Sequence, residues 1–285
     1  MTPSATHVGS RPCPRPDFSP RPDTRPWDLL LLATVPIAIV GLYALPETVT
    51  REFVFQYTEP TVATAYAAHF VHFEAAHVVA NVAGYALLVT LCYLLAVYAG
   101  RRRFFVTAFS AILLSFPFAL SALNLAVPRD AIFYGFSGLN MAFLGLLVVL
   151  LGEYVRAVFW PEWDRRYVGG AFFASLGLVA ILAVPLGTSS VVLAGGSLGI
   201  AGVYSRGLVR RKIRWRSMAR EIRERTGYGD LLVVAAVTVV AYLFVGFPSN
   251  VQHVGAVLNL YVHFLGYSVG FTATYLLLRS ELVDG

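Results

Sequence analysis

Long apolar stretches, separated by short polar loops, make up most of this chain. A helix that crosses a bilayer needs about 20 mainly apolar residues. Eight stretches reach that length, near residues 28–46, 75–99, 104–127, 137–157, 168–186, 188–208, 230–247 and 256–278. The pattern predicts an all-α polytopic membrane helix bundle with about eight transmembrane helices. The fifth and sixth stretches are separated only by a short turn around Pro185 and Gly187, so one re-entrant feature is the alternative to two passes.

The composition agrees with a membrane protein. Of the 285 residues, 57% are hydrophobic and 13% are charged, whereas a soluble domain carries about 25% charged residues. Cys13 lies in a polar segment and Cys92 in an apolar one, so the sequence contains no readable disulfide framework or cysteine metal site.

Polar segments divide the chain into regions. Residues 1–27 are rich in Pro, Arg, Ser and Thr and are expected to be a disordered cytoplasmic tail without a signal peptide. Residues 28–279 form the expected transmembrane domain, with a basic cytoplasmic loop at about 209–229. A short cytoplasmic tail, 280–285, follows.

Basic residues mark every second loop. They cluster at Arg101–Arg103, between Arg156 and Arg166, and from Arg206 to Arg225. Because excess Lys and Arg identifies cytoplasmic loops, we expect a multi-pass protein of the cell membrane with both termini in the cytoplasm. The net charge of +6 is then explained by topology, and no nucleic-acid partner is expected. The stretch from Arg206 to Glu224 is interpreted as an ordinary basic loop, with an amphipathic helix on the anionic inner leaflet as the alternative.

Three polar residues are expected at one depth in the membrane. His77, Ser137 and His263 each lie within about two turns of the start of a span that runs from outside to inside. A polar group in hydrocarbon is costly unless it is paired, so such residues are candidates for function. Serine and histidine together indicate nucleophilic hydrolysis.

Ser137 lies in the sequence Gly135-Phe136-Ser137-Gly138. One interpretation is close helix packing through small residues, which Gly145 extends along the same span. The other is a nucleophile at a helix N-terminus, where backbone N–H groups and the helix dipole stabilise an oxyanion.

His263 is followed by Gly266 and Gly270 on the same helical face. That face can pack closely against the helix that begins at Ser137, which would bring the histidine to the serine. The alternative is a histidine with a packing role only. His253, in the preceding outer loop, is a rival base, and the loop from Gly246 to Gly255 is the expected flexible cap.

His77 and Asn81 are four residues apart and share a helical face. Two side-chain donors beside the Ser137 N–H group would form an oxyanion hole; an interhelical polar clamp is the alternative. The nearby His69, His72 and Glu74 do not match a known metal-ligand pattern, so neither a metal nor another cofactor is expected.

These motifs resemble those of the rhomboid intramembrane serine proteases. The stretch His72–Asn81 is similar to the family's paired-histidine and asparagine signature, Gly135–Gly138 to its nucleophile motif, and His263–Gly270 to its histidine helix. The resemblance covers roughly residues 28–157 and 230–278.

The resemblance implies a rhomboid-like core and a Ser–His dyad, with Ser137 as nucleophile and His263 as general base. His77, Asn81 and the Ser137 N–H group would form the oxyanion hole. The implied reaction is hydrolysis of peptide bonds in or near the transmembrane helices of membrane-protein substrates, near the extracytoplasmic face. The lipid bilayer and these substrates are the expected partners, and the sequence contains no indication of oligomeric state.

Three features depart from the family pattern. Two extra spans, at about 168–208, lie between the serine and the histidine. Met141 occupies the position where many members carry a tyrosine that stacks on the histidine, and Tyr267 is the nearest aromatic alternative. The first outer loop, from Glu47 to Ala68, lacks a clear Trp-Arg signature.

Other functions compete with proteolysis. A catalytically inactive rhomboid-like protein would bind transmembrane helices without cutting them. A transporter or channel would need charged residues deep in its spans and symmetric broken helices, and the sequence contains no acidic residue deep in any span and no convincing repeat. An unrelated helical scaffold would leave the three motifs unexplained.

Overall fold

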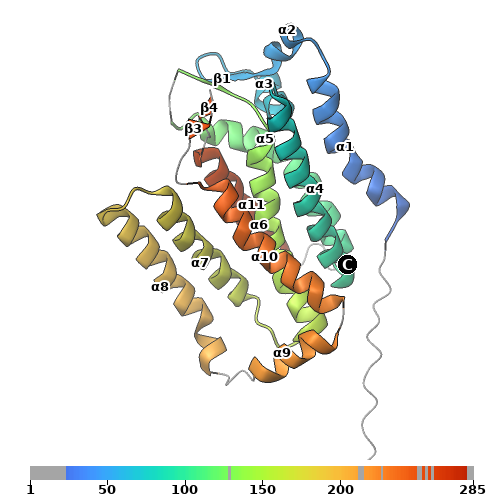
Figure 1. Ribbon diagram of the computed structural model, residues 1–285, viewed down its shortest axis with the longest axis vertical. Coiled ribbons are helices and arrows are strands. Elements are labelled where there is room, and N and C mark those ends of the chain that lie inside the picture. Colours follow the sequence, from blue (N-terminus) through green and yellow to red (C-terminus); the bar gives the residue numbers. More distant parts are fainter. Residues whose placement is uncertain are drawn as a thin grey trace, which may run out of the picture.

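A computed structural model describes residues 24–127, 130–210, 215–225, 227–248, 252–253, 256–257 and 260–280. In the described part of the chain, eight helices of 18 or more residues form a bundle. A shorter helix, α9, lies across one end (Figure 1). The long helices are α1 (Pro26–Tyr43), α4 (Ala75–Tyr98), α5 (Arg102–Asn124), α6 (Ser137–Tyr154), α7 (Arg166–Ala183), α8 (Thr188–Arg210), α10 (Tyr228–Gly246) and α11 (Leu260–Arg279), and α9 spans Trp215–Glu224.

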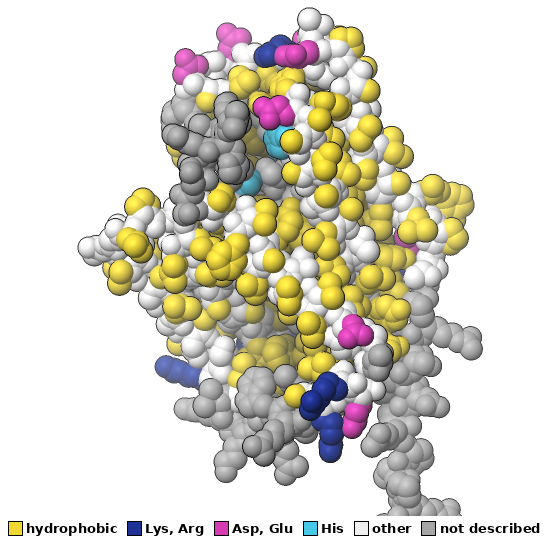
Figure 2. Space-filling model, viewed as in Figure 1, with side chains coloured by type: hydrophobic (Ala, Val, Ile, Leu, Met, Phe, Trp, Pro, Cys, Tyr) yellow, Lys and Arg dark blue, Asp and Glu magenta, His cyan; other side chains and the backbone are white. Residues whose placement is uncertain are grey.

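In the described part of the chain, seven helices are long and apolar enough to cross a membrane. They are α1, α4, α5, α6 with its π-helical continuation η3 (Val155–Phe159), α7, α8 and α10. Figure 2 agrees with this assignment, because hydrophobic side chains cover most of the middle of the visible face and charged side chains gather toward its ends. The chain is therefore a multi-pass membrane protein built as an α-helical bundle.

Helix α11 is outside this set although it has 20 residues, because polar residues such as His263, Ser268 and Thr274 interrupt its apolar sequence. Membrane crossing by the predicted eighth span therefore stays a prediction. Its helix begins a few residues later than the predicted start near residue 256. Ala256–Val257 forms strand β4, which pairs antiparallel with Gln252–His253 (β3), and α11 begins at Leu260.

The stretch from 168 to 208 folds as a helical hairpin, and each of its two helices is long and apolar enough to cross a membrane. Helices α7 and α8 run antiparallel and pack closely through glycines. A Cβ atom at Gly170 would lie 2.8 Å from Ser205 Oγ, and one at Gly177 would lie 3.0 Å from Leu198 Cγ. Helix α8 lies at the edge of the bundle (Figure 1).

Helix α6 is the centre of the bundle. Within its span, 78% of the residues are buried, compared with 17% in α1. It packs against α4 and α11 most extensively, and also against α5, α7 and α10. Its sequence is apolar on all sides, as expected for a helix that other helices surround.

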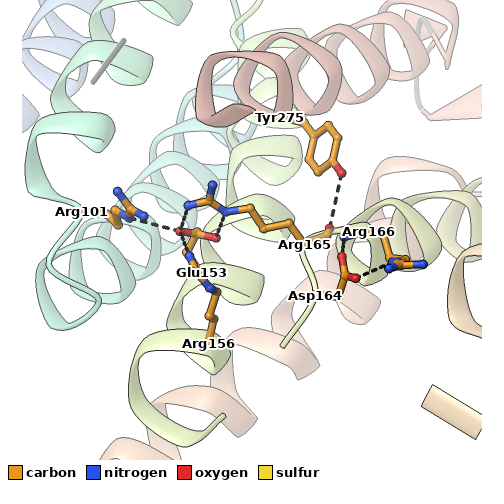
Figure 3. A network of polar contacts seen from close by, with 7 residues as sticks. All are labelled: Arg101, Glu153, Arg156, Asp164, Arg165, Arg166 and Tyr275. Carbon is orange, nitrogen blue, oxygen red and sulfur yellow. Dashed lines mark hydrogen bonds and ion pairs between the residues drawn. The ribbon is translucent and has the colours of Figure 1, made fainter. Parts of the chain in front are cut away.

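A buried carboxylate joins three elements at the end of α6 that lies away from Ser137 (Figure 3). Glu153 is 3% exposed and accepts hydrogen bonds from Arg101 at 3.1 Å and from Arg165 at 2.8 and 3.0 Å. Arg156 lies 3.8 Å from the same carboxylate. The network connects the α4–α5 turn, α6 and the start of α7.

The basic loop predicted at 209–229 is partly helical. Helix α9 packs against η3 and α10, and Ile222 contacts the core. Arg225 donates a hydrogen bond to the Val158 carbonyl group, and its guanidinium lies 5.9 Å from the ring centre of Phe159. Residues 1–23 and 281–285, which hold most of the two predicted tails, lie outside the described residues.

Candidate active site

Ser137 is the first residue of α6 and is half-buried. The turn before it is held in two ways. Strand β2 (Ile132–Phe133) pairs antiparallel with β1 (Phe55–Gln56) of the first long loop, and the Gly135 N–H group donates to the Ala68 carbonyl at 2.9 Å. Gly135 has φ +108°, which a side chain would disfavour. The N–H groups of Leu139 and Asn140 donate to the Phe136 carbonyl at 3.0 Å. Those of Ser137 and Gly138, at the very start of the helix, have no intrahelical acceptor.

His72 supports the same turn, and it was not among the predicted site residues. Its Nδ1 lies 3.1 Å from the Phe70 carbonyl oxygen, which can only accept, so Nδ1 carries the proton. Nε2 is then an acceptor and lies 3.4 Å from the N–H group of Phe136, the residue before the serine. Burial, and secondarily the neighbouring His77, lower the pKa of His72 to about 4, which keeps this acceptor neutral at pH 7.

Four glycines allow α6 and α11 to approach closely. A Cβ atom at Gly138 would lie 2.5 Å from Val262 Cγ1, and one at Gly270 would lie 2.6 Å from Ala142 Cα. Gly266 lies directly against the Gly138 carbonyl group, and Gly145 against the backbone of Tyr267 and Phe271. Gly135, which was expected to belong to this packing, lies instead in the turn before α6 and against the His77 ring, because the helix begins only at Ser137.

This contact places His263 beside the start of α6. Val262 and Gly266, which flank the histidine on its helix, both touch Gly138, the residue after the serine. His263 is 5% exposed, and its Nδ1 donates a hydrogen bond of 2.7 Å to the Gly246 carbonyl at the end of α10. Nε2 is buried without a hydrogen-bond partner among the described residues, Ser137 included. A neutral imidazole in this tautomer has its lone pair on Nε2 and can accept a proton there.

His77 and Asn81 lie on the face of α4 that packs against α6. A Cβ atom at Gly135 would lie 2.9 Å from His77 Cε1, so the ring covers the turn before Ser137. Asn81 Nδ2 donates to the His77 carbonyl at 3.0 Å, and Asn140 Nδ2 donates to the Asn81 carbonyl at 3.0 Å. Asn140 was missed in the sequence, although a buried amide inside an apolar span was a usable signal.

Tyr267 does not orient the histidine. Its hydroxyl group lies 2.5 Å from Ser175 Oγ on α7. Met141 is 1% exposed and lies one turn after Ser137, against Gly246 and Gly266. The group that contacts His263 Nδ1 is thus a backbone carbonyl from α10, which no side-chain motif could reveal.

The contacts of His69 indicate a structural role. It is fully buried, and Nε2–H is shared between the Pro117 carbonyl at 3.1 Å and Ser121 Oγ at 3.2 Å. Burial lowers the pKa of His69 to about 4. Within the described residues, no group of three or more metal-ligating side chains exists. The side chain of His253 and most of the expected cap loop, 246–255, lie outside the described residues.

No protein family, curated protein or solved structure matches this chain. Figure 2 shows histidine atoms in a recess near the end of the molecule where the first long loop lies, close to an acidic side chain. The arrangement comprises a hydroxyl group at a helix N-terminus, a buried imidazole acceptor on the helix packed against it, and amide and imidazole donors on α4.

Proposed function

We propose that the protein is a rhomboid-like intramembrane serine endopeptidase that hydrolyses peptide bonds in or near transmembrane helices. One observation carries this proposal. The Nδ1–H group of His263 donates to the Gly246 carbonyl, while Nε2 has no hydrogen-bond partner among the described residues. The neighbouring Val262 and Gly266 contact Gly138 in the first turn of α6. A general base beside a serine needs this division between its two nitrogens.

In the proposed reaction, Ser137 Oγ attacks the substrate carbonyl carbon while His263 Nε2 takes the hydroxyl proton. The tetrahedral intermediate then breaks its C–N bond, and the imidazolium gives its proton to the leaving amine. Water attacks the resulting acyl-enzyme with His263 again as base, and the acid product and the free serine form. Serine and imidazole in apo structures commonly lie beyond hydrogen-bond distance and approach when substrate binds.

The oxyanion would lie at the N-terminus of α6. The Ser137 N–H group has no intrahelical acceptor there, and the positive end of the helix dipole favours negative charge. His77 lies over the adjacent turn. Asn81 uses one amide hydrogen within its own helix, and its second hydrogen is the donor proposed for the oxyanion.

The distribution of arginines supports the proposed orientation. The arginines around Glu153 lie at the end of α6 away from Ser137, and α9, which carries further arginines, lies across the same end of the bundle (Figure 1). Because cytoplasmic loops are rich in Arg and Lys, we place that end and both termini in the cytoplasm of the cell membrane. The site then lies near the extracytoplasmic face, and α11 is the eighth span.

The first test is proteolysis by the purified protein in lipid vesicles, with a panel of single-span substrates. Replacement of Ser137→Ala or His263→Ala should each lower the cleavage rate at least about 1,000-fold, because dyad members act as a unit. Ser280→Ala, at the exposed end of α11, is the matched control, and His253→Ala tests the rival base. Cleavage that survives Ser137→Ala would exclude this nucleophile.

The absence of a Ser137–His263 hydrogen bond and the presence of Met141 favour one alternative, a non-cleaving binder of transmembrane helices. Such a protein would retain the single-span proteins in co-purification equally with wild type and with Ser137→Ala. It would yield no cleavage product with either.

A further inference from the structure

The carbonyl group of Gly246, at the end of α10, accepts a hydrogen bond from a histidine on another helix. Gly246 is the last residue of α10, where carbonyl groups have no intrahelical donor. The His263 Nδ1–H group on α11 supplies that donor at 2.7 Å. The negative end of the α10 dipole therefore faces the imidazole, which favours the protonated ring that forms during base catalysis.

Gly246 is held in place by Met141. A Cβ atom at Gly246 would lie 2.8 Å from Met141 Sδ and 3.0 Å from Met141 Cε. The thioether therefore packs directly on the backbone at the end of α10. Met141 also approaches α11, because a Cβ atom at Gly266 would lie 3.2 Å from Met141 Cβ. Met141, on α6, thus contacts both α10, whose Gly246 carbonyl accepts the histidine proton, and α11, which carries the histidine.

We propose that Gly246 and Met141 are positioning residues for the general base. Met141 seats the end of α10, and the Gly246 carbonyl fixes the ring of His263 in the tautomer with Nδ1 protonated and Nε2 facing the start of α6. In a catalytic triad an aspartate performs this task. This inference rests on the proposed protease function, and it assigns the third group of the site to a main-chain oxygen.

The substitution Gly246→Ala tests whether the contact between Gly246 and Met141 positions His263. Gly246 is not among the glycines with positive φ, so alanine tests the contact with Met141 and not backbone strain. The new methyl group must displace the Met141 thioether or the end of α10, and either movement shifts the carbonyl from His263 Nδ1. A misplacement of about 1 Å at a catalytic group costs up to about 100-fold in rate.

The activity experiment compares Gly246→Ala, Met141→Ala and the double variant Gly246→Ala/Met141→Ala, in lipid vesicles. We expect kcat of Gly246→Ala to fall about 10- to 100-fold with KM nearly unchanged. Met141→Ala should also lower kcat, because it removes the group that seats the end of α10. The double variant, which has room for the new methyl group, should be faster than Gly246→Ala but slower than wild type. Gly196→Ala is the matched control, because no atom lies within 4 Å of its Cβ position. An unchanged kcat in Gly246→Ala, or a double variant no better than the single one, would overturn the proposal.

A second readout needs no substrate. In protein labelled with ¹⁵N-histidine, the ring signals of His263, assigned by their loss in His263→Ala, report the tautomer. We expect the Nδ1–H form in wild type, its loss or mixing in Gly246→Ala, and its partial return in the double variant. An unchanged tautomer in Gly246→Ala would overturn the positioning role. If wild type cleaves nothing, the proposed protease function fails, whereas the same spectra still decide whether Gly246 orients the ring.

Discussion

At the scale of single residues, Gly135 connects backbone conformation to the proposed oxyanion hole. It has φ +108°, and a Cβ atom there would lie 2.9 Å from the His77 ring. We expect Gly135→Ala to lower the cleavage rate at least about 10-fold and to destabilise the fold by about 1–3 kcal/mol, because it adds a clash to backbone strain. Gly100→Ala is a matched control, since Gly100 also has positive φ, +70°, but no atom within 4 Å of the Cβ position. Equal losses in activity from both substitutions would show that the His77 contact is not important.

At the scale of elements, Glu153 joins the α4–α5 turn, α6 and α7. Its side chain is 3% exposed, whereas Glu47, paired with Arg51 at the surface, is 61% exposed. Removal of one partner from a buried ion pair costs about 3–5 kcal/mol, and an exposed pair contributes at most about 1 kcal/mol. Glu153→Gln should therefore lower the free energy of unfolding in detergent by about 3 kcal/mol, and Glu47→Gln by less than about 1 kcal/mol. Similar values for the two variants would argue against a structural role for the network.

At the scale of the whole molecule, two buried histidines make stability depend on pH. Burial lowers the pKa of His69 and His72 to about 4, from the ordinary value of 6.5. Between pH 6.5 and pH 4 the unfolded chain binds protons that the folded protein does not, so stability is complete above about pH 6.5 and falls as the pH is lowered. At 1.36 kcal/mol per pKa unit, each histidine accounts for a loss of roughly 3 kcal/mol by pH 4.

Unfolding of the detergent-solubilised protein between pH 7 and pH 4.5 measures this effect. The double variant His69→Gln/His72→Gln should show a flatter dependence of stability on pH than wild type. A double variant with the wild-type slope would place the titrating groups elsewhere in the molecule.

The sequence by itself determined the elements and the spacing of the candidate residues within them. Apolar length predicted eight membrane spans, because the bilayer requires a minimum run of hydrocarbon side chains whatever their neighbours are. Seven helices in the described part of the chain are long and apolar enough to cross a membrane. The spacing of His263, Gly266 and Gly270 determined a common helical face, because a helix repeats every 3.6 residues. These are local properties, so they could be read before any tertiary contact was known.

Only the tertiary structure decided which groups meet. The Gly246 carbonyl reaches His263 across 17 residues, and Asn140 reaches Asn81 across 59. A backbone carbonyl is present at every residue, so no sequence pattern distinguishes the one that accepts a histidine proton. The β3–β4 pairing likewise moved the start of α11 to Leu260 although the preceding residues are apolar. Contacts between distant segments depend on how the helices pack, and that packing is a property of all the side chains together.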